Sequence, residues 1–426
     1  MTPGPLLPEP GAVPAVPPTA RVKGARTSLL PSLVRGWPSL RYNVSVVSRI
    51  VGRIFVLFGV FWGGWAVAAA NIEHSLGLSN GGFGLLVSVS LVGGASANFV
   101  GGTLCERFGT SKVLAAALSS WAALLLFGAA MRTPFIMELA IAVIFLNAGL
   151  VDVAMNVAGA AALSDRPGKL VALHARFNAG AAAGAALTGA LLAAKISWRW
   201  TWVGVAGVAI AFAVSAWREP LSGGVRGESR SLLGSVALLR REHLLPLAAT
   251  FALAAMVEGG IDLWGVLFLR TQLAAGLLVG AGGAVLGYSV AALARSLLGP
   301  RVGHRGPARG VVIGAGTAAV GAALLAIAPV AALGAVGLIL AAGGISMCWP
   351  LMVAEAGRGR ERAGVVVGAV SAFGYLGLVA GPAVVGGVAN ATGLRGALGI
   401  LAAAALIVAL IPATWRGLRP RGALTQ

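Results

Sequence analysis

Apolar runs recur along the whole chain of 426 residues, and only 11% of its residues are charged. Each run is about 18 to 25 residues long, which is the length of an α-helix that crosses a hydrocarbon core about 30 Å thick. A mean hydropathy of +0.89 leaves too few charged side chains to cover a soluble domain. The 63 glycines suit close packing between membrane helices. The pattern predicts an all-α membrane protein.

The apolar runs predict about twelve transmembrane helices. Their expected bounds, roughly, are 54–71, 81–104, 113–131, 134–160, 170–193, 200–217, 245–269, 274–294, 310–328, 330–354, 364–389 and 396–414. Boundaries read from a sequence are uncertain by about two to four residues.

The net charge of +19 raises the possibility of nucleic-acid binding, but the positions of the cations argue against it. Of the 32 Lys and Arg residues, 27 fall in the alternate connections that share a side with the N-terminus, and 5 fall opposite. No cation is placed deep inside a predicted helix. Because cytoplasmic connections are rich in Lys and Arg, the pattern predicts a multi-pass protein of the inner (cytoplasmic) membrane with both termini cytoplasmic.

The polar segments divide the chain. Residues 1–45 contain nine prolines and predict either a disordered cytoplasmic tail or residues that precede a later translation start. The longest polar connection, 218–243, is a cytoplasmic linker between two six-helix halves, 46–217 and 244–414, and residues 231–242 in it suit a short interfacial helix. Residues 415–426 form a second cytoplasmic tail.

The connection after the second predicted helix reads GGTLCERFGTSKVL, from Gly101 to Leu114. It resembles the signature loop of the major facilitator superfamily in Gly102, Leu104, Arg107, Gly109 and Leu114. Glu106 stands in place of the usual aspartate, Thr110 and Ser111 replace two cations, and Lys112 supplies one cation a residue late. A weaker copy after the eighth helix, SLLGPRVGHRGPAR, retains Leu298, Arg301, Gly303 and Arg305.

The resemblance implies a major facilitator fold of two pseudo-symmetric halves, in which this loop stabilises the outward-facing state. Gly109 suits a positive φ at the turn, and Gly102 is expected to let a neighbouring helix pack closely. The Glu106–Arg107 pair is expected to bridge the two halves. Any short cytoplasmic loop contains glycine and arginine, but here spacing and topological position agree.

Acidic side chains inside the predicted seventh helix are the main candidates for transport chemistry, because charges at membrane depth are costly. Glu258 and Asp262 are one turn apart on one face, about 6 Å from each other, and cannot both ionise cheaply in a low-dielectric site. That property suits a proton carrier. Gly259 and Gly260 weaken the helix between them, and Trp264 suits stacking on a substrate. The alternative is that both acids only bind neighbouring helices.

The fourth helix and the loop after it supply a second group. Asp152 and Asn156 share a helix face and either line a central cavity or tie the helix to a neighbour. The loop adds gate or relay candidates: Asp165, His174 and Arg176, with Arg301 and Gly303 from the second loop copy.

The motifs DVAMN in the fourth helix and EGGIDLW in the seventh resemble a branch of the superfamily, the MosC-like, rhizopine-associated transporters. Asp262 stands one residue early relative to that branch, which leaves its orientation open. On the eleventh helix, Gly377 and Gly381 have the spacing of a helix-packing motif, and Pro382 predicts a kink. The aromatic residues Trp62, Trp65, Trp349 and Tyr375 either line the cavity or serve packing.

The sequence therefore predicts a monomeric secondary transporter of a small solute, with protons as the coupling ion and alternating access as the mechanism. The resemblance to the MosC-like branch implies a small polar solute such as a polyol or sugar, whereas the composition fits amphiphile efflux equally well. A non-transporting membrane sensor and a membrane-embedded enzyme are the alternatives. Scattered His residues and two separate cysteines, Cys105 and Cys348, provide no metal or cofactor site, so no cofactor is expected.

Overall fold

The computed structural model describes residues 44–162, 167–219, 221, 232–275, 277–298, 307–357 and 363–412. All regular elements in these ranges are helices. The two predicted tails lie outside the described residues, except for 44 and 45, where the first helix begins. Asp165, Arg301 and Gly303 also lie outside them.

The first part of the described chain contains seven labelled helices. They are α1 (Val44–Leu76), α2 (Asn80–Phe108), α3 (Thr110–Ala130), α4 (Pro134–Ala162), α5 (Pro167–Ala193), α6 (Arg199–Arg218) and α7 (Leu232–Arg241). The short helix predicted at 231–242 is therefore present as α7.

The second part begins with a helix in three sections, α8 (Leu245–Gly260), the π-helical η1 (Ile261–Gly265) and α9 (Val266–Thr271). It continues with α10 (Leu277–Leu293), the π-helical η2 (Ala294–Leu298), α12 (Pro307–Ile327), α13 (Ala331–Ile345), α14 (Cys348–Gly357) and α15 (Ala363–Leu410).

Nine stretches of the described residues are long and apolar enough to cross a membrane. Every one of the twelve predicted stretches overlaps a described helix. The helices α5 and α10 are not among the nine. The ninth stretch, 369–410, contains two of the predicted helices.

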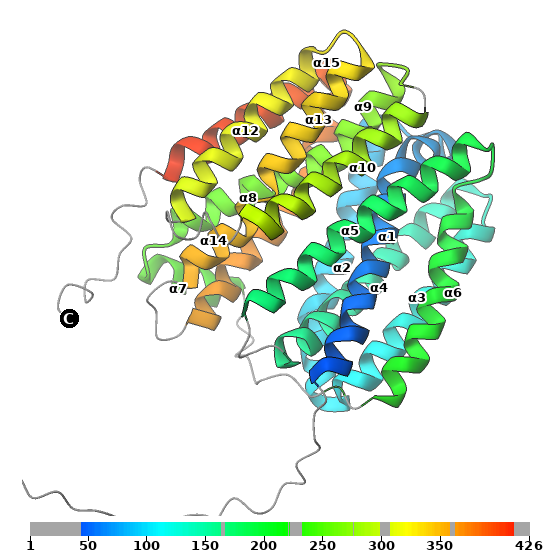
Figure 1. The fold of residues 1–426 in the computed structure, drawn as a ribbon, viewed down its shortest axis with the longest axis vertical. Coiled ribbons are helices and arrows are strands. Elements are labelled where there is room, and N and C mark those ends of the chain that lie inside the picture. Colours follow the sequence, from blue (N-terminus) through cyan, green and yellow to red (C-terminus); the bar gives the residue numbers. More distant parts are fainter. Residues whose placement is uncertain are drawn as a thin grey trace, which may run out of the picture. The chain divides into compact units, whose positions relative to one another are not determined.

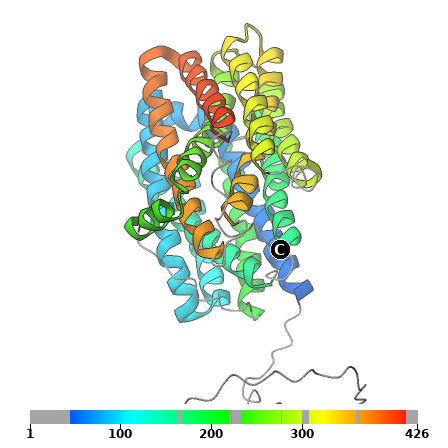
Figure 2. The same cartoon turned by 90° about the vertical axis from the view of Figure 1, so that its left-hand side faces the viewer.

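The helix α15 reverses direction within its length, as Figure 2 shows at the top of the view, where orange passes into red. Gly393 has φ 81° and ψ 166°, which are not helical values. A positive φ is strained for residues with a Cβ, so glycine allows the bend here. The predicted break between 389 and 396 is thus at Gly393.

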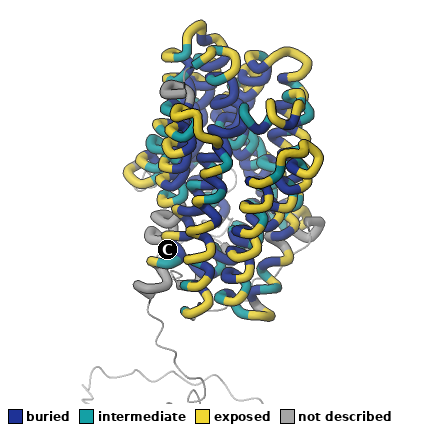
Figure 3. Tube along the Cα trace, turned by 90° about the vertical axis from the view of Figure 1, so that its right-hand side faces the viewer, coloured by how far each residue is buried: buried dark blue, intermediate teal, exposed yellow. Residues whose placement is uncertain are grey.

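The helices α1 to α6 pack mainly on one another, and α8 to α15 do the same. Two helix pairs join these groups most extensively, α2 with α15 and α5 with α10. Figure 1 shows α5 and α10 side by side in the middle of the view. Burial alternates along each helix, with exposed stretches on the outer side (Figure 3), as expected for a bundle whose outer face contacts lipid.

The interface of α1 and α5 is held by glycines on both helices. A Cβ added at Gly63 would overlap the carbonyl oxygen of Ala181, and one added at Gly184 would overlap that of Val60. Gly59 and Gly180 approach the opposite backbone in the same way. Because the two backbones touch, there is no room for side chains at these crossings.

Aromatic side chains fill the interior of the first group of helices. Trp65 is 3% exposed and stacks on Trp202 with an interplanar angle of 11°. Trp62 contacts Phe61 and Phe145 edge to face. In this conformation Trp65 serves packing, the second of the two roles considered from the sequence.

Candidate functional site

The helix that carries Glu258 and Asp262 is not continuous. The sequence predicts one regular helix over 245–269, whereas residues Ile261–Gly265 form a π-helical turn directly after Gly259 and Gly260. A π turn inserts extra backbone per turn and changes which side chains share a face. Asp262 and Trp264 lie inside this turn, so their directions could not be read from regular helical spacing.

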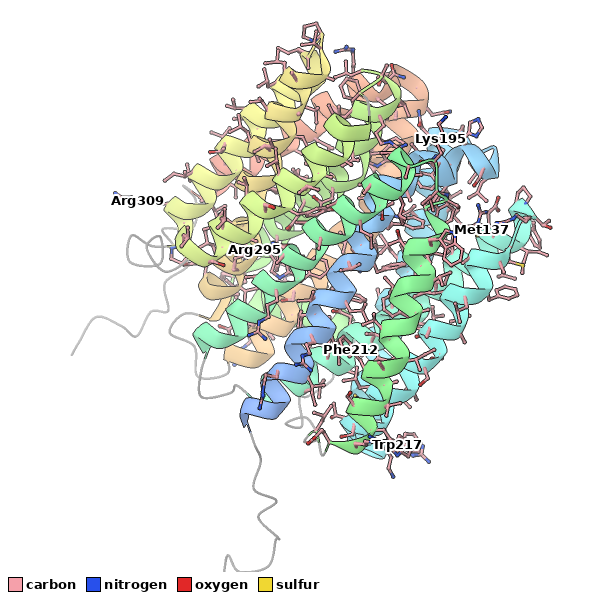
Figure 4. All side chains as sticks on the ribbon, turned by 45° about the vertical axis from the view of Figure 1, so that its right-hand side comes forward. Met137, Lys195, Phe212, Trp217, Arg295 and Arg309 are labelled. Atoms are coloured by element: carbon pink, nitrogen blue, oxygen red, sulfur yellow. The ribbon has the colours of Figure 1, made fainter. Side chains whose placement is uncertain are left out.

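Glu258 forms an ion pair with Arg295 of η2. The distance from Arg295 Nη2 to Glu258 Oε1 is 2.5 Å, and the two side chains are 12% and 23% exposed. The expectation that no cation lies inside a helix is therefore wrong for Arg295. The predicted eighth helix ends at 294, whereas the structure continues to Leu298 as η2 and places Arg295 within the bundle. Figure 4 shows Arg295 among the helices and Arg309 at the outer edge.

A proline explains the second contact of Arg295. The Nε of Arg295 donates a hydrogen bond of 2.9 Å to the carbonyl oxygen of Ser346. Pro350 is four residues further on and has no N–H to donate to that carbonyl, so the helix opens there. The sequence predicts one helix over 330–354, whereas α13 ends at Ile345 and α14 begins at Cys348. The interruption thus creates an acceptor for Arg295.

Two further polar side chains surround this pair. Tyr288 of α10 lies near Glu258 and Asp262 and is 7% exposed. Within the described part of the chain, Asp262 has no hydrogen bond or ion pair. The cluster thus holds two carboxylates and one guanidinium. We call Glu258, Asp262, Tyr288 and Arg295 the acid–arginine cluster.

Asp152 and Asn156 form a second polar group, on α4. Asn156 Nδ2 donates hydrogen bonds of 2.9 Å to the side-chain and main-chain oxygens of Asp152. The two residues therefore share a face, as predicted. Tyr375 of α15 lies near Asp152, so this group faces the other group of helices.

Trp349 lies near both polar groups. Its ring contacts Tyr375 edge to face, with centroids 5.7 Å apart, and also Phe251 at 4.5 Å. Its neighbour Cys348 is close enough to Glu258 and Arg295 for both charges to act on it. Trp349 is therefore adjacent in sequence to a neighbour of one polar group and in contact with a neighbour of the other.

Trp264 is fully buried between the two groups of helices. Its ring meets Phe83 of α2 edge to face at 6.5 Å, and a Cβ at Gly386 of α15 would lie 3.0 Å from it. In this conformation the ring contacts protein on these sides. Its predicted stacking on a substrate stays a prediction.

The loop between α2 and α3 has the turn predicted from its glycine. Gly109 has φ 89°, and its N–H donates to the carbonyl of Cys105. The expected close packing at Gly102 is absent, since a Cβ there would meet no atom within 4 Å. Arg107 is exposed, with its guanidinium 5.2 Å from the ring of Phe108. The side chain of Glu106 lies outside what the structure describes.

The departure from the family pattern at Ser111 has a structural explanation. Its hydroxyl donates 2.7 Å to the carbonyl of Glu219 and accepts 2.7 Å from the N–H of Leu221. These bonds tie the loop to the end of α6, which a cation at this position would not do in the same way. Lys112, one residue later, is exposed.

The remaining predicted residues are placed as follows. His174 belongs to α5, and its side chain is not described. The guanidinium of Arg176, on the same helix, lies across Gly52 of α1. Gly377 approaches the backbone of Ala252 on α8, and Gly381 lies against Met256 of the same helix. Pro382 is inside α15, and the N–H of the next residue donates to Ser88 of α2.

Sequence reasoning missed a contact between the two groups of helices. Arg270 of α9 donates one hydrogen bond to the carbonyl of Val67 and another, of 2.9 Å, to Asn71 Oδ1 on α1. In the sequence Arg270 looks like any cation at a helix end. Among the described residues there is no group of three or more His, Cys, Asp or Glu side chains that could hold a metal ion.

Residues 51–375 match the Major Facilitator Superfamily. The chain belongs to this family. Its members are transporters rather than enzymes, in agreement with the motifs, the apolar helices and the polar groups inside the bundle. A relative from Yersinia pestis, described as an uncharacterized MFS-type transporter, is 26% identical over 362 residues, which is 83% of this chain and 92% of the relative.

Solved structures of other transporters have a similar fold. A mutant of the nucleoside transporter NupG has a TM-score of 0.70 and 13% identity, and covers 86% of this chain and 99% of its own. A bacterial homologue of the human drug peptide transporters PepT1 and PepT2 has a TM-score of 0.65 and 14% identity, covering 87% and 98%. The human organic anion transporter MFSD10 has a TM-score of 0.62 and 17% identity, covering 88% and 100%.

Proposed function

We propose that this member of the superfamily is a proton-coupled secondary active transporter that moves a small polar solute across the cytoplasmic membrane by alternating access. The observation that carries the proposal is the acid–arginine cluster, which holds two carboxylates and one guanidinium inside the bundle. One negative charge is left over, and a proton neutralises it at the lowest cost. A group that gains and loses a proton at this depth is the element a proton-coupled transporter needs.

The proposal includes the membrane topology. We infer twelve crossings, consisting of the nine long apolar stretches together with α5, α10 and the division of α15 at Gly393. The two six-helix halves are 46–217 and 244–414, joined by the linker 218–243. Without Arg295, the connections on the side of the N-terminus still hold 26 of the 32 cations, which supports cytoplasmic termini. We expect the chain to work as a monomer, since each half completes the site of the other.

Contacts between the halves support an inward-facing state. Gly84 packs closely against the carbonyl oxygen of Pro382, and Gly189 packs closely against the side chain of Ala281. Arg270 donates a hydrogen bond to Asn71 of α1. All of these residues are near connections that the topology places outside the cell. On the opposite side Gly102, in the signature loop, has open space next to it. Alternating access then requires the outer contacts to break and the signature loop to engage.

The hydrogen bonds of Arg270 to α1 supply a test of this state. In Arg270→Ala the two bonds are lost, which shifts the equilibrium toward outer opening by about 1.4 kcal/mol, or tenfold. Ala69 on α1 is fully buried. We expect Ala69→Cys to react about tenfold faster with an impermeant maleimide applied from outside when Arg270→Ala is also present.

Arg395→Ala is the matched control for this test. Arg395 also donates two hydrogen bonds, but to the carbonyls of Ala326 and Ala328 within its own half. We expect this variant to leave the labelling rate of Ala69→Cys unchanged. Equal labelling with and without Arg270→Ala would contradict a role of Arg270 in outer closure.

Within the acid–arginine cluster we assign proton carriage to Asp262. Glu258 is held by Arg295 at 2.5 Å, whereas Asp262 has no cation of its own among the described residues. Asp152, bonded to Asn156 and facing Tyr375, is assigned to solute binding together with Asn156. The solute then lies between the two polar groups, next to Trp349.

The solute class rests on the resemblance to the MosC-like branch and on the residues in the two groups. Carboxylate, amide and phenol groups next to aromatic rings suit hydroxyl-rich solutes, which need many hydrogen bonds and one apolar face. We therefore favour a polyol or sugar-like solute over an amphiphile. The gate or relay candidates of the cytoplasmic side remain Asp165, His174, Arg176, Arg301 and Gly303.

The experiment uses the purified protein in sealed vesicles with a pH-sensitive dye inside. Hexitols, cyclitols and hexoses are first screened by thermal stabilisation, and stabilising solutes are then tested for solute-driven proton flux. We expect a proton flux in the natural protein. In Asp262→Asn we expect the flux to fall at least tenfold (about 1.4 kcal/mol) while stabilisation by the solute persists.

Glu138→Gln controls for the loss of an acid elsewhere. Glu138 is close to the outer end of α4 and outside both polar groups, so the flux should persist. Solute binding without proton movement in the natural protein would favour a sensor or an uncoupled carrier. Unchanged flux in Asp262→Asn, alone and combined with Asp152→Asn, would rule out proton coupling through these acids.

A further inference from the structure

A groove of about 640 Å³ lies on the outside of the bundle, along α1 between α5 and α6. The helix α1 packs against both neighbours, whereas α5 and α6 make few contacts with each other. The space left between them forms the groove. Its volume falls in the range of about 300 to 1,000 Å³ that is typical of small-molecule sites. Neither polar group of the proposed transport site contributes to its lining.

Three arginines lie at one end of the groove. Arg49 and Arg53 are four residues apart on α1 and therefore on one face, and Arg176 reaches the same place from α5, across Gly52. All three side chains are exposed. No acidic residue is among those that line the groove. Guanidinium groups bind phosphate through paired hydrogen bonds, so this end suits a phosphate group.

The rest of the groove is apolar and faces outward. It is lined by side chains that include Val56, Leu187, Val208 and Phe212. Leu187 and Val208 are 48% and 42% exposed, which in a membrane protein means contact with lipid. Figure 4 shows Phe212 on α6 beside the neighbouring α1. No charged side chain follows the arginines along this part.

The groove is long enough for an acyl chain of one leaflet. It extends from Arg49 to Thr201 of α6, which lies beside Gly64 of α1. That is fifteen steps of α1, or about 22 Å at 1.5 Å per residue, whereas half of a hydrocarbon core of 30 Å is about 15 Å. The basic end is close to the start of α1, which the proposed topology places at the cytoplasmic surface.

We propose that this groove is a binding site for one anionic phospholipid of the cytoplasmic leaflet. The phosphate binds Arg49, Arg53 and Arg176, and an acyl chain lies along Val56 and Val208 toward the centre of the membrane. Both parts of the ligand are needed, because the basic end and the apolar walls belong to one groove. The site is separate from the transport site and holds whether or not the chain is proton-coupled.

The test measures bound lipid. The purified full chain is exchanged into phosphatidylcholine vesicles with or without phosphatidylglycerol, extracted in mild detergent and analysed by native mass spectrometry. We expect one phosphatidylglycerol to remain bound and to raise the melting temperature. In Arg49→Gln with Arg53→Gln, retained phosphatidylglycerol should fall at least tenfold, which corresponds to about 1.4 kcal/mol.

Two further variants separate the parts of the site. Gly204 lines the groove, and a Cβ there meets no protein atom within 4 Å, so the side chain of Gly204→Trp should enter the apolar part and displace the lipid. Arg132 is exposed at the opposite end of the bundle, so Arg132→Gln should retain lipid normally.

Three outcomes would overturn the proposal. The first is equal retention of phosphatidylcholine and phosphatidylglycerol, and the second is unchanged retention in the double arginine variant. The third is stabilisation by inorganic phosphate or glycerol phosphate as large as that by phosphatidylglycerol, which would indicate a soluble phosphate ligand. Loss of phosphatidylglycerol in both Gly204→Trp and the double arginine variant, with retention in Arg132→Gln, supports the lipid site.

Discussion

Replacing Arg295 by glutamine is expected to abolish transport and to lower the free energy of unfolding by about 3 kcal/mol. Removing one partner of a buried ion pair leaves the other charge without compensation, at a cost of about 3 to 5 kcal/mol. Glu258 retains 23% exposure, so we expect the lower end of that range. In Arg295→Gln two carboxylates remain in the bundle, and at least one must bind a proton continuously. A carrier that cannot release its proton cannot complete the cycle.

A double variant distinguishes charge balance from simple damage. Glu258→Gln combined with Arg295→Gln removes both charges, so the stability lost in Arg295→Gln should be partly restored. Transport should remain absent, because the pair is then missing from the site. Stability is measured by chemical unfolding of the purified protein, and transport by uptake into vesicles.

Arg309→Gln is the matched control for this pair. Arg309 is exposed and points away from the bundle (Figure 4), so its removal should change neither stability nor transport. If the double variant proved less stable than Arg295→Gln alone, the ion pair would not be the reason for the loss.

The second large effect is expected at the glycines between α1 and α5. In Gly63→Ala the new methyl group overlaps the carbonyl oxygen of Ala181, so the two backbones must separate. Overpacking of this kind typically costs about 1 to 3 kcal/mol, and a contact with rigid backbone favours the upper value. We expect the melting temperature to fall markedly in Gly63→Ala and in Gly184→Ala, whose Cβ would overlap the carbonyl of Val60.

Gly207→Ala supplies the control for the glycine prediction. It makes the same change in α6, where a Cβ meets no atom within 4 Å. Because alanine favours a helix over glycine by up to about 1 kcal/mol, this variant should be as stable as the natural protein or slightly more stable. Similar losses at Gly63 and Gly207 would mean that the close contact of α1 and α5 does not determine the effect.

Local sequence patterns were sufficient for part of the site. The shared face of Asp152 and Asn156 follows from regular helical spacing, and the structure has it. The turn at Gly109 follows from the conformational freedom of glycine at a short connection. The short helix α7 was also expected. Each of these features depends on residues within one or two helical turns.

Patterns of this kind could not predict the acid–arginine cluster. Arg295 was expected in a cytoplasmic connection, because the length of an apolar run indicates where hydrophobicity ends but not where the helix ends. The π turn at Ile261–Gly265 has no reliable signal beyond the two glycines before it. Pro350 was not used to predict a break in its helix, and no local pattern indicates that Arg295 binds the carbonyl of Ser346.

The sequence by itself determined the membrane location, the family and the order of helices. Membrane location and helix order depend on the length of the hydrophobic runs and on glycine positions within one segment. The family depends on a short motif. Tertiary structure decided which charges meet. The pairs Glu258–Arg295 and Arg270–Asn71 join residues 37 and 199 positions apart. Such contacts depend on how helices pack and rotate against one another, and in a bundle of apolar helices the packing is set by glycines such as Gly63 and Gly184 rather than by the charges themselves.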